Sequence, residues 1–183
     1  MTRDDFAQLL NLSKEFIAAG RPNRPGTPLV GNFITIHNTD NTDHGADAKA
    51  HSKFVRNTGF FLLPSGKKDV VSWHFTVDDH QVIQQLPITE VAFHAKSGNK
   101  QSVAIEVCMN DGIDQPAAFL RAARLTALLL FDSGAEAALD RVVPHLHWTG
   151  KKCPVLLLDQ GKIGAKWQGF LELVKAERSH IDP

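Results

Sequence analysis

The chain has 183 residues, 43% of them hydrophobic and 22% charged, which is typical of a soluble globular protein that can bury its own core. Twenty Lys and Arg residues balance twenty Asp and Glu residues, so no overall field favours nucleic acid or an anionic membrane as partner. The start, Met1 to Asp5, is acidic where a signal peptide is basic, and no stretch reaches the roughly twenty apolar residues of a membrane-spanning helix. We therefore expect a chain that is made in the cytoplasm and needs a separate route to any target outside it.

The N-terminal segment predicts a helix followed by an extended loop. Thr2 followed by Asp5 resembles a capping box, and Gly20 can end the helix. The three prolines within residues 21–28 indicate an extended loop. Apolar residues at near-helical spacing support the helix: Phe6, Leu9, Leu10, Phe16 and Ile17.

A strand and a second helix come next. Residues 33–37 alternate and are rich in β-branched side chains, which predicts a strand that ends at His37. A polar loop follows, and residues 46–57 predict a helix. Three of its residues are expected to face inward: Ala46, Ala50 and Phe54.

The middle of the chain predicts three further strands. Residues 70–77 form the first, residues 78–81 a turn, and residues 82–86 a short return strand. Residues 103–109 are apolar on both sides, which indicates a strand at the centre of a sheet.

The last third predicts two helices separated by a histidine-rich loop. Residues 116–131 are the clearest helix, with Pro116 in its first turn. Residues 144–154 form the loop, and residues 167–176 a short final helix. Strands mixed with helices, and no linker between them, predict an α/β fold in one domain over residues 1–183: a mixed central β-sheet flanked by helices, with its core from about residue 20 to 176.

The two cysteines have different surroundings. Cys108 ends an apolar run and is predicted to be a small core residue. Cys153 lies in a polar loop close to two histidines, where a thiolate can serve as a metal ligand. Two cysteines do not make the disulfide framework of a small secreted protein.

Three features can carry chemistry. His37 ends a buried strand, and sites in α/β proteins form where strands end. His145, His147 and Cys153 lie within nine residues, so imidazole and thiolate can fold back onto one ion, and two nitrogens and one sulfur suit Zn²⁺ and leave a position open for water. Glu106 lies in the most apolar strand, where it is either paired in an ion pair, exposed at an edge, or used as a general base.

Six segments, in order, resemble the type-2 N-acetylmuramoyl-L-alanine amidase family, and most closely its phage endolysin and Bacillus autolysin branch. The resemblance covers residues 20–154. It implies a mixed β-sheet flanked by helices, a fold that animal peptidoglycan-recognition proteins share. The matching segments are Ile34-Thr35-Ile36-His37-Asn38-Thr39, Gly45-Ala46-Asp47-Ala48-Lys49-Ala50-His51, Val71-Ser72-Trp73-His74-Phe75-Thr76-Val77-Asp78-Asp79, Ala92-Phe93-His94-Ala95, Ser102-Val103-Ala104-Ile105-Glu106-Val107-Cys108, and residues 145–154.

The resemblance implies one zinc ion per chain, with His37, His145 and Cys153 as its ligands. It favours His145 over His147, because relatives place this ligand three residues before the Trp. It also implies Glu106 as the catalytic general base and Lys151, two residues before the cysteine, as the catalytic lysine.

The resemblance places three more residues near the substrate groove: Trp73, His74 and His94. His51 and His80 are expected to be structural or at the surface. Many relatives have Trp where this chain has Phe93, a change expected to alter the shape of the groove and not the chemistry.

The implied reaction is hydrolysis of the lactyl–L-alanine amide bond of peptidoglycan. The alternative is a recognition module that binds muropeptide without cutting it, and the presence of Cys153 argues against that alternative. Relatives often carry a separate wall-binding domain, whereas here we expect the groove alone to supply affinity for the wall. A holin or secretion system, or an immunity protein, would be the expected partner of a lysin or effector, and the oligomeric state is left open.

Overall fold

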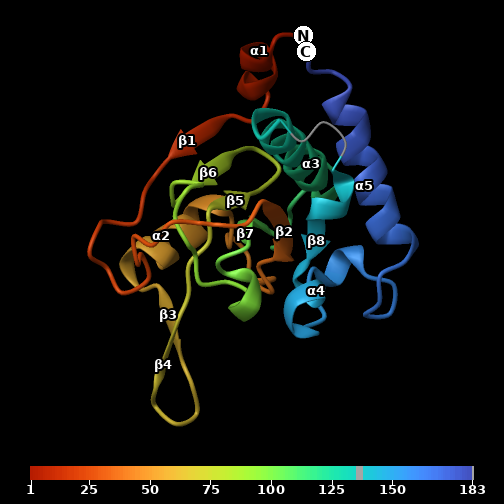
Figure 1. Ribbon diagram of the computed structural model, residues 1–183. Coiled ribbons are helices and arrows are strands. Elements are labelled where there is room, and N and C mark those ends of the chain that lie inside the picture. The colour runs from red at the N-terminus through yellow and green to blue at the C-terminus, as the bar shows by residue number, and fades with distance from the viewer. Residues whose placement is uncertain (135–137, 183) are drawn as a thin grey trace.

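The two longest strands, β2 (Phe33–Asn38) and β7 (Ser102–Val107), lie side by side and parallel at the centre of a six-stranded sheet (Figure 1). Successive side chains of a strand point to opposite faces of the sheet. The register pairs His37 with Glu106. A metal-binding residue type and a carboxylate therefore lie next to each other on one face.

The remaining strands complete a mixed sheet in the order β1-β6-β5-β7-β2-β8. β8 (Val142–Pro144) is parallel to β2, and β5 (Phe75–Val77) is parallel to β7. β6 (Val82–Gln84) returns antiparallel to β5, and β1 (Leu12–Lys14) is parallel to β6 at the edge. In the turn between β5 and β6, one carboxylate oxygen of Asp78 accepts hydrogen bonds from two main-chain N–H groups. The computed structural model describes residues 1–134 and 138–182 of this α/β domain.

Helices cover both faces of the sheet. α3 (Gln115–Asp132) and α5 (Ala165–Arg178) pack on the face that carries Ile36 and Ile105, where they form the main hydrophobic core. α2 (Ala48–Asn57) contacts β5 and β6 from the face that carries His37 and Glu106. The second face is more polar, and it is the one that opens into a cavity.

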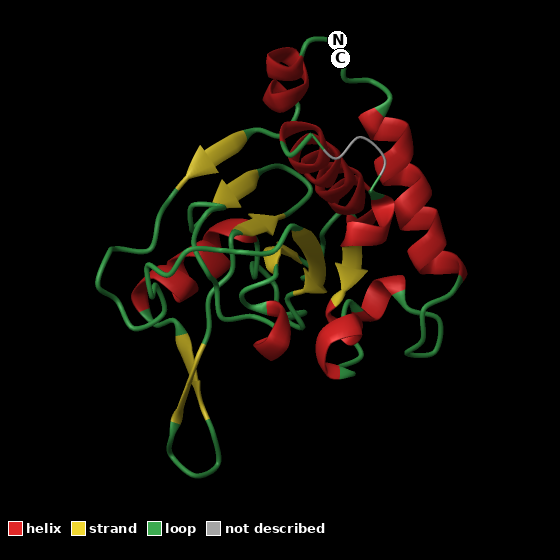
Figure 2. Cartoon of the chain, viewed as in Figure 1, coloured by secondary structure: helices red, strands yellow, loops and turns green. Residues whose placement is uncertain are grey.

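Shorter elements connect these layers (Figure 2). Within the described residues, no helix has both the length and the apolar character needed to cross a membrane. The short helices are α1 (Arg3–Gln8), α4 (His145–Thr149) and three 3₁₀ turns, η1 (Lys96–Gly98), η2 (Leu139–Arg141) and η3 (Val155–Leu157).

The predicted N-terminal helix is shorter than the spacing of its apolar residues indicates. Thr2 does cap it, accepting a hydrogen bond from the main-chain N–H of Asp5. The helix ends after Gln8, Asn11 adopts a left-handed conformation, and residues 12–14 then pair with β6 as a strand. The free edge of β6 gives this segment main-chain partners that a longer helix would leave unused. The prediction of a helix up to Gly20 was therefore wrong.

The strand predicted over residues 70–77 is split into two. β3 (Phe60–Leu62) and β4 (Lys68–Val70) form an antiparallel hairpin that projects from the body of the molecule (Figure 1), and β5 starts only at Phe75. We call residues 60–70 the arm. The arm is not among the elements predicted from the sequence.

Two other expectations need correction. α2 turns Ala48, His51, Ser52 and Val55 inward, whereas Ala50 is exposed. The predicted histidine-rich loop in fact begins as strand β8 and continues as helix α4. The central position of residues 103–109, the turn at 78–81 and the helix at 116–131 are confirmed, to within a few residues at their ends.

Candidate metal centre and catalytic cavity

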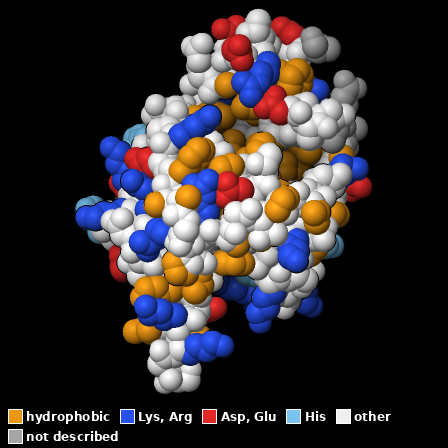
Figure 3. All heavy atoms as spheres, turned by 60° about the vertical axis from the view of Figure 1, so that its left-hand side comes forward, with side chains coloured by type: hydrophobic (Ala, Val, Ile, Leu, Met, Phe, Trp, Pro, Cys, Tyr) orange, Lys and Arg blue, Asp and Glu red, His pale blue; other side chains and the backbone are white. Residues whose placement is uncertain are grey.

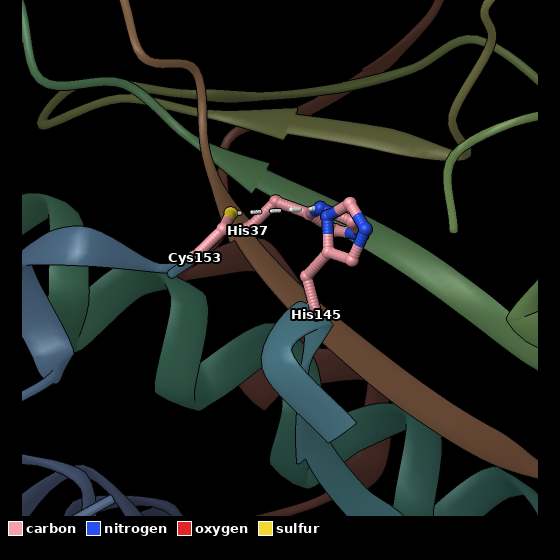
Figure 4. A group of neighbouring side chains, drawn as sticks. All are labelled: His37, His145 and Cys153. Atoms are coloured by element: carbon pink, nitrogen blue, oxygen red, sulfur yellow. Dashed lines mark hydrogen bonds between the residues drawn. The ribbon is translucent and has the colours of Figure 1, made fainter. Parts of the chain in front are cut away.

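Three side chains from separate segments meet at one end of the sheet (Figure 4). His37 comes from β2, His145 begins α4 directly after β8, and Cys153 follows α4. Because β2 and β8 are parallel and Ile36 pairs with Pro144, the residues that follow this pair, His37 and His145, are neighbours. The donor atoms of the three side chains all lie within 4.8 Å of one another, and all three residues are buried.

The turn after α4 brings Cys153 back to the two histidines. Gly150 ends the helix in a left-handed conformation, which glycine adopts without strain. The main-chain N–H of Leu146 donates to the carbonyl oxygen of Cys153 at 3.0 Å, which holds the returning chain against the start of the helix. The Cys153 Sγ then lies 3.8 Å from the His37 Nδ1.

The protonation of these groups fits a cation site. Burial lowers the pKa of His37 well below its usual range and that of His145 to about 4, so both imidazoles are neutral at pH 7. Burial, with a contribution from Glu106, raises the pKa of Cys153 to about 12. A thiol so placed ionises only when a cation compensates its charge.

One donor atom is left without a partner. Throughout residues 1–134 and 138–182 no group forms a hydrogen bond with the His145 Nδ1, although that atom is buried. Buried polar atoms are almost always satisfied, so an orphaned nitrogen on a histidine that adjoins a thiol and a second imidazole indicates a ligand position. Two nitrogens and one sulfur are a donor set that suits Zn²⁺.

Glu106 projects beside the cluster from the neighbouring strand. Its Oε1 lies 3.7 Å from the His37 Nδ1, and its Oε2 has no hydrogen-bond partner in the described part of the chain. Burial raises the pKa of Glu106 to about 8, opposed in part by the Lys151 ammonium. A carboxyl group with a pKa near neutrality can both accept and return a proton at physiological pH.

Lys151 lies at the mouth of the same cavity. Its Nζ is 4.0 Å from the Asp40 carboxylate, and its side chain is half exposed. The positive charge lowers the pKa values of His37 and His145, which places it within electrostatic range of the cluster. Lys151 can therefore stabilise negative charge that develops on a substrate held there.

The cluster forms one end of a cavity of about 620 Å³. That volume is in the range of ordinary ligand sites, which are about 300–1,000 Å³. The far wall is apolar and aromatic, in contrast to the polar end with the cluster. This apolar wall consists of Ala46, Ala50, Phe54, Phe61, Val71, Trp73 and Phe93.

The sequence pattern that defines the family described as N-acetylmuramoyl-L-alanine amidase matches residues 25–155, which include the whole cluster and Glu106. The chain belongs to this amidase family. It is 41% identical to the N-acetylmuramoyl-L-alanine amidase CwlH of Bacillus subtilis (strain 168) over 89% of its length, and 40% identical to the N-acetylmuramoyl-L-alanine amidase XlyA of the same organism over 82%. The chain spans only 60% and 48% of these two relatives.

A solved structure of the catalytic domain of XlyA has a similar fold. It matches with a TM-score of 0.77 and 38% sequence identity, over 90% of this chain and 99% of that domain. The mixed sheet with flanking helices predicted from the family resemblance is thereby confirmed.

In this member of the amidase family, the second histidine of the cluster is His145. His147 is exposed and stacks against Phe33, with 6.2 Å between ring centroids. His145 and His147 are two positions apart on α4, and side chains at that spacing do not share a face of a helix, so the alternative assignment of His147 has no geometric support.

His74 does not lie where the family resemblance implied. It is fully buried and does not line the cavity. Its Nδ1 accepts a hydrogen bond from the main-chain N–H of Ala104 at 2.9 Å, and its Nε2 lies 2.8 Å from the carbonyl oxygen of Glu90. Both ring nitrogens are thus used within the fold, and the expectation that His74 lies in the substrate groove is corrected. His74 instead connects β7 to the loop at Glu90. Arg24 holds the same loop through two hydrogen bonds to the Glu90 carboxylate.

Trp73 and His94 do line the cavity, and so does His51, which had been expected to be structural or at the surface. His51 is also buried in the fold, with its Nδ1 2.9 Å from the carbonyl oxygen of Asp47. His80 is exposed, as expected. Asp40 was missed, although its position three residues after His37 in a polar loop could have indicated it.

Proposed function

We propose that the chain is a zinc-dependent N-acetylmuramoyl-L-alanine amidase that hydrolyses the amide between the lactyl group and the L-alanine of peptidoglycan. The observation that carries the proposal is the meeting of His37, His145 and Cys153 with Glu106 in one cavity. The names of CwlH and XlyA support the same reaction.

The proposed metal is one Zn²⁺ per chain, held by His37, His145 and Cys153. When bound, it would supply Lewis-acid chemistry that makes water a nucleophile near neutral pH. The pKa of the Cys153 thiol and the neutral state of the two imidazoles are consistent with this assignment.

Glu106 and Lys151 have separate roles in the proposed mechanism. Glu106 accepts the proton of the attacking water and delivers a proton to the departing nitrogen of L-alanine. Its raised pKa matches both steps, because the group must gain and then lose the same proton. Lys151 stabilises the negative charge that develops on the carbonyl oxygen.

The second candidate is a module that binds muropeptide without cutting it. Such a module needs neither a carboxyl group with a buried, unpaired oxygen and a raised pKa nor a buried thiol beside two imidazoles. Both cost free energy to bury, which favours the catalytic alternative.

We expect digestion of purified peptidoglycan to release free stem peptides and to leave intact glycan strands. The measurement is mass spectrometry of the products, together with metal analysis of protein purified without chelator. We expect close to one zinc per chain. Cut sugars, or cut peptide cross-links, would refute the assignment of the bond, and full activity of metal-free protein would refute the assignment of the metal.

A further inference from the structure

The two ring nitrogens of His37 face different neighbours. Nδ1 faces the cluster, near the Cys153 Sγ and the Glu106 Oε1. Nε2 lies 3.0 Å from the Nδ1 of His94, with the two rings nearly perpendicular. A neutral imidazole carries one proton, so His37 offers Nδ1 to a metal only if that proton is on Nε2.

A chain of hydrogen bonds determines where the proton of His94 lies. It starts at the Trp148 indole N–H, which can only donate, and does so to the Thr35 hydroxyl at 2.8 Å. The Thr35 hydroxyl donates to the Ser102 Oγ at 2.7 Å, and the Ser102 hydroxyl donates to the Gly98 carbonyl at 3.0 Å. Because Ser102 has only one proton to give, its contact of 3.5 Å with the His94 Nε2 must be one that it accepts.

The direction of this chain continues to His37. With the His94 proton on Nε2, the His94 Nδ1 is unprotonated and accepts from the His37 Nε2. We propose that His94 is a positioning residue that holds His37 in the tautomer whose Nδ1 is free to bind the metal. The main chain of His94 is fixed by the Asn99 side chain, which accepts hydrogen bonds from the N–H groups of His94 and Ala95.

The inference rests on the proposed metal site, but its test does not need activity on peptidoglycan. His94→Asn keeps an acceptor near the position of Nδ1, whereas His94→Leu has similar size and no acceptor. In metal-free protein, the ring ¹⁵N shifts of His37 report its tautomer, and competition with a chromogenic chelator gives the zinc Kd.

We expect wild type and His94→Asn to hold the proton of His37 on Nε2. His94→Leu should give mixed tautomers and a zinc Kd about 10–100-fold higher, as is usual when a partner behind a metal-binding histidine is lost. The exposed His80 provides a control, and His80→Leu should change neither measurement. If His94→Leu does not fold, Ser102→Ala removes the next hydrogen bond and should shift both measurements in the same direction.

A proton on the Nδ1 of His37 in the wild-type protein would overturn the proposal. An unchanged tautomer and zinc Kd in His94→Leu would do the same. Failure to cleave peptidoglycan would count against the proposed function and would leave these measurements valid.

A second inference comes from the arm, which presents three consecutive apolar side chains to solvent: Phe61 is 56% exposed, Leu62 68% and Leu63 40%. Figure 3 shows hydrophobic and lysine side chains together on this projection. Single exposed apolar residues are common, but a run of them on a projecting hairpin indicates a binding surface.

The apolar surface of the arm is continuous with the cavity. Trp73, Phe54 and Phe61 all line the cavity wall, with ring centroids 6.5 Å apart for the first pair and 5.1 Å for the second. The Trp73 N–H is already donated to the Thr76 hydroxyl. This row of rings therefore offers flat apolar surface and no free hydrogen-bonding group.

We infer that the arm binds the glycan strand beyond the unit that is cleaved, with the C–H face of a sugar ring on Phe61. A pyranose ring has hydroxyl groups at its edge and an apolar face, so it can cover Phe61 and keep its polar groups in water. A peptide amide laid on the same rings would find no hydrogen-bonding group there, because the Trp73 N–H is already donated to Thr76. The inference rests on the proposed function.

Phe61→Ala should raise the KM for glycan strands of several disaccharides about tenfold, the loss expected for one aromatic contact. The rise should be clearly smaller for a single disaccharide-peptide. Val30 is an apolar residue outside the arm and is 74% exposed, so Val30→Ala should change neither KM. The same pair of substitutions in the Glu106→Gln background allows glycan binding to be measured without turnover.

An equal rise of KM on both substrates, or none, would overturn the inference. If Phe61→Ala weakened binding of the protein to anionic lipid vesicles and left glycan binding unchanged, the inference would be overturned as well. If the wild-type protein cleaved neither substrate, the proposed function would fail, and binding of glycan strands to the Glu106→Gln protein would still test the arm.

Discussion

Glu106→Gln is expected to lower turnover on purified peptidoglycan by about a hundredfold to ten-thousandfold, the usual effect of losing a general base. The amide keeps the shape of the side chain but cannot accept the proton of water. Zinc content should not change, because His37, His145 and Cys153 all remain. The free energy of unfolding should hold or increase, since the Glu106 Oε2 is buried without a partner and an amide costs less to bury.

The measurements are zinc stoichiometry, turnover and chemical denaturation of the same preparation. Glu172→Gln is the matched control, because Glu172 is exposed on α5 and should give wild-type values. Loss of zinc from Glu106→Gln would make Glu106 a ligand or a support of the ligands. Full turnover would require another base, and Asp40, a carboxylate that lines the same cavity, would then be tested.

Cys153→Ser is expected to weaken zinc binding by more than about a hundredfold, since even residues behind the ligands contribute 10–100-fold. Serine keeps the size of the side chain but is a much poorer ligand for zinc than a thiolate. Activity should fall with the zinc content. A competition assay for zinc and the initial rate on peptidoglycan measure the two effects.

Cys108→Ser is the control for Cys153→Ser. Cys108 is fully buried beside Ala48 and Ile83, away from the cluster. The substitution should cost about 1–3 kcal/mol of stability if its hydroxyl finds no partner, and leave zinc and turnover nearly intact. Equal loss of zinc from both variants would show that the wrong cysteine has been assigned.

The parts of the fold that could be predicted are those with a strong local pattern. β2 and β7 alternate or are apolar throughout, and α3 repeats its apolar residues over 18 residues. His37 and Glu106 could be proposed as site residues because each is a polar group in such a strand. That they lie side by side follows from the register, which no local pattern contains.

The rest depended on tertiary contacts. Residues 12–14 form a strand because β6 offers a free edge, and their own apolar spacing indicates a helix. Trp73, His74 and His94 come from two short segments with similar local sequence patterns. Both ring nitrogens of His74 are hydrogen-bonded to the main chain, whereas His94 contacts His37, which is 57 positions away in the sequence. Which role each takes depends on the neighbours that the fold brings to it.

The position of β2 between β7 and β8 also governs the order in which the sheet can form during synthesis. Both pairings of β2 are parallel and join segments far apart in the sequence, and such non-local contacts form slowly. During synthesis, β2 has no partner in the sheet until residue 102 has been made, and Cys153 follows His37 by 116 residues. A chain interrupted before Cys153 would therefore lack the third donor atom of the cluster, however well its earlier strands had paired.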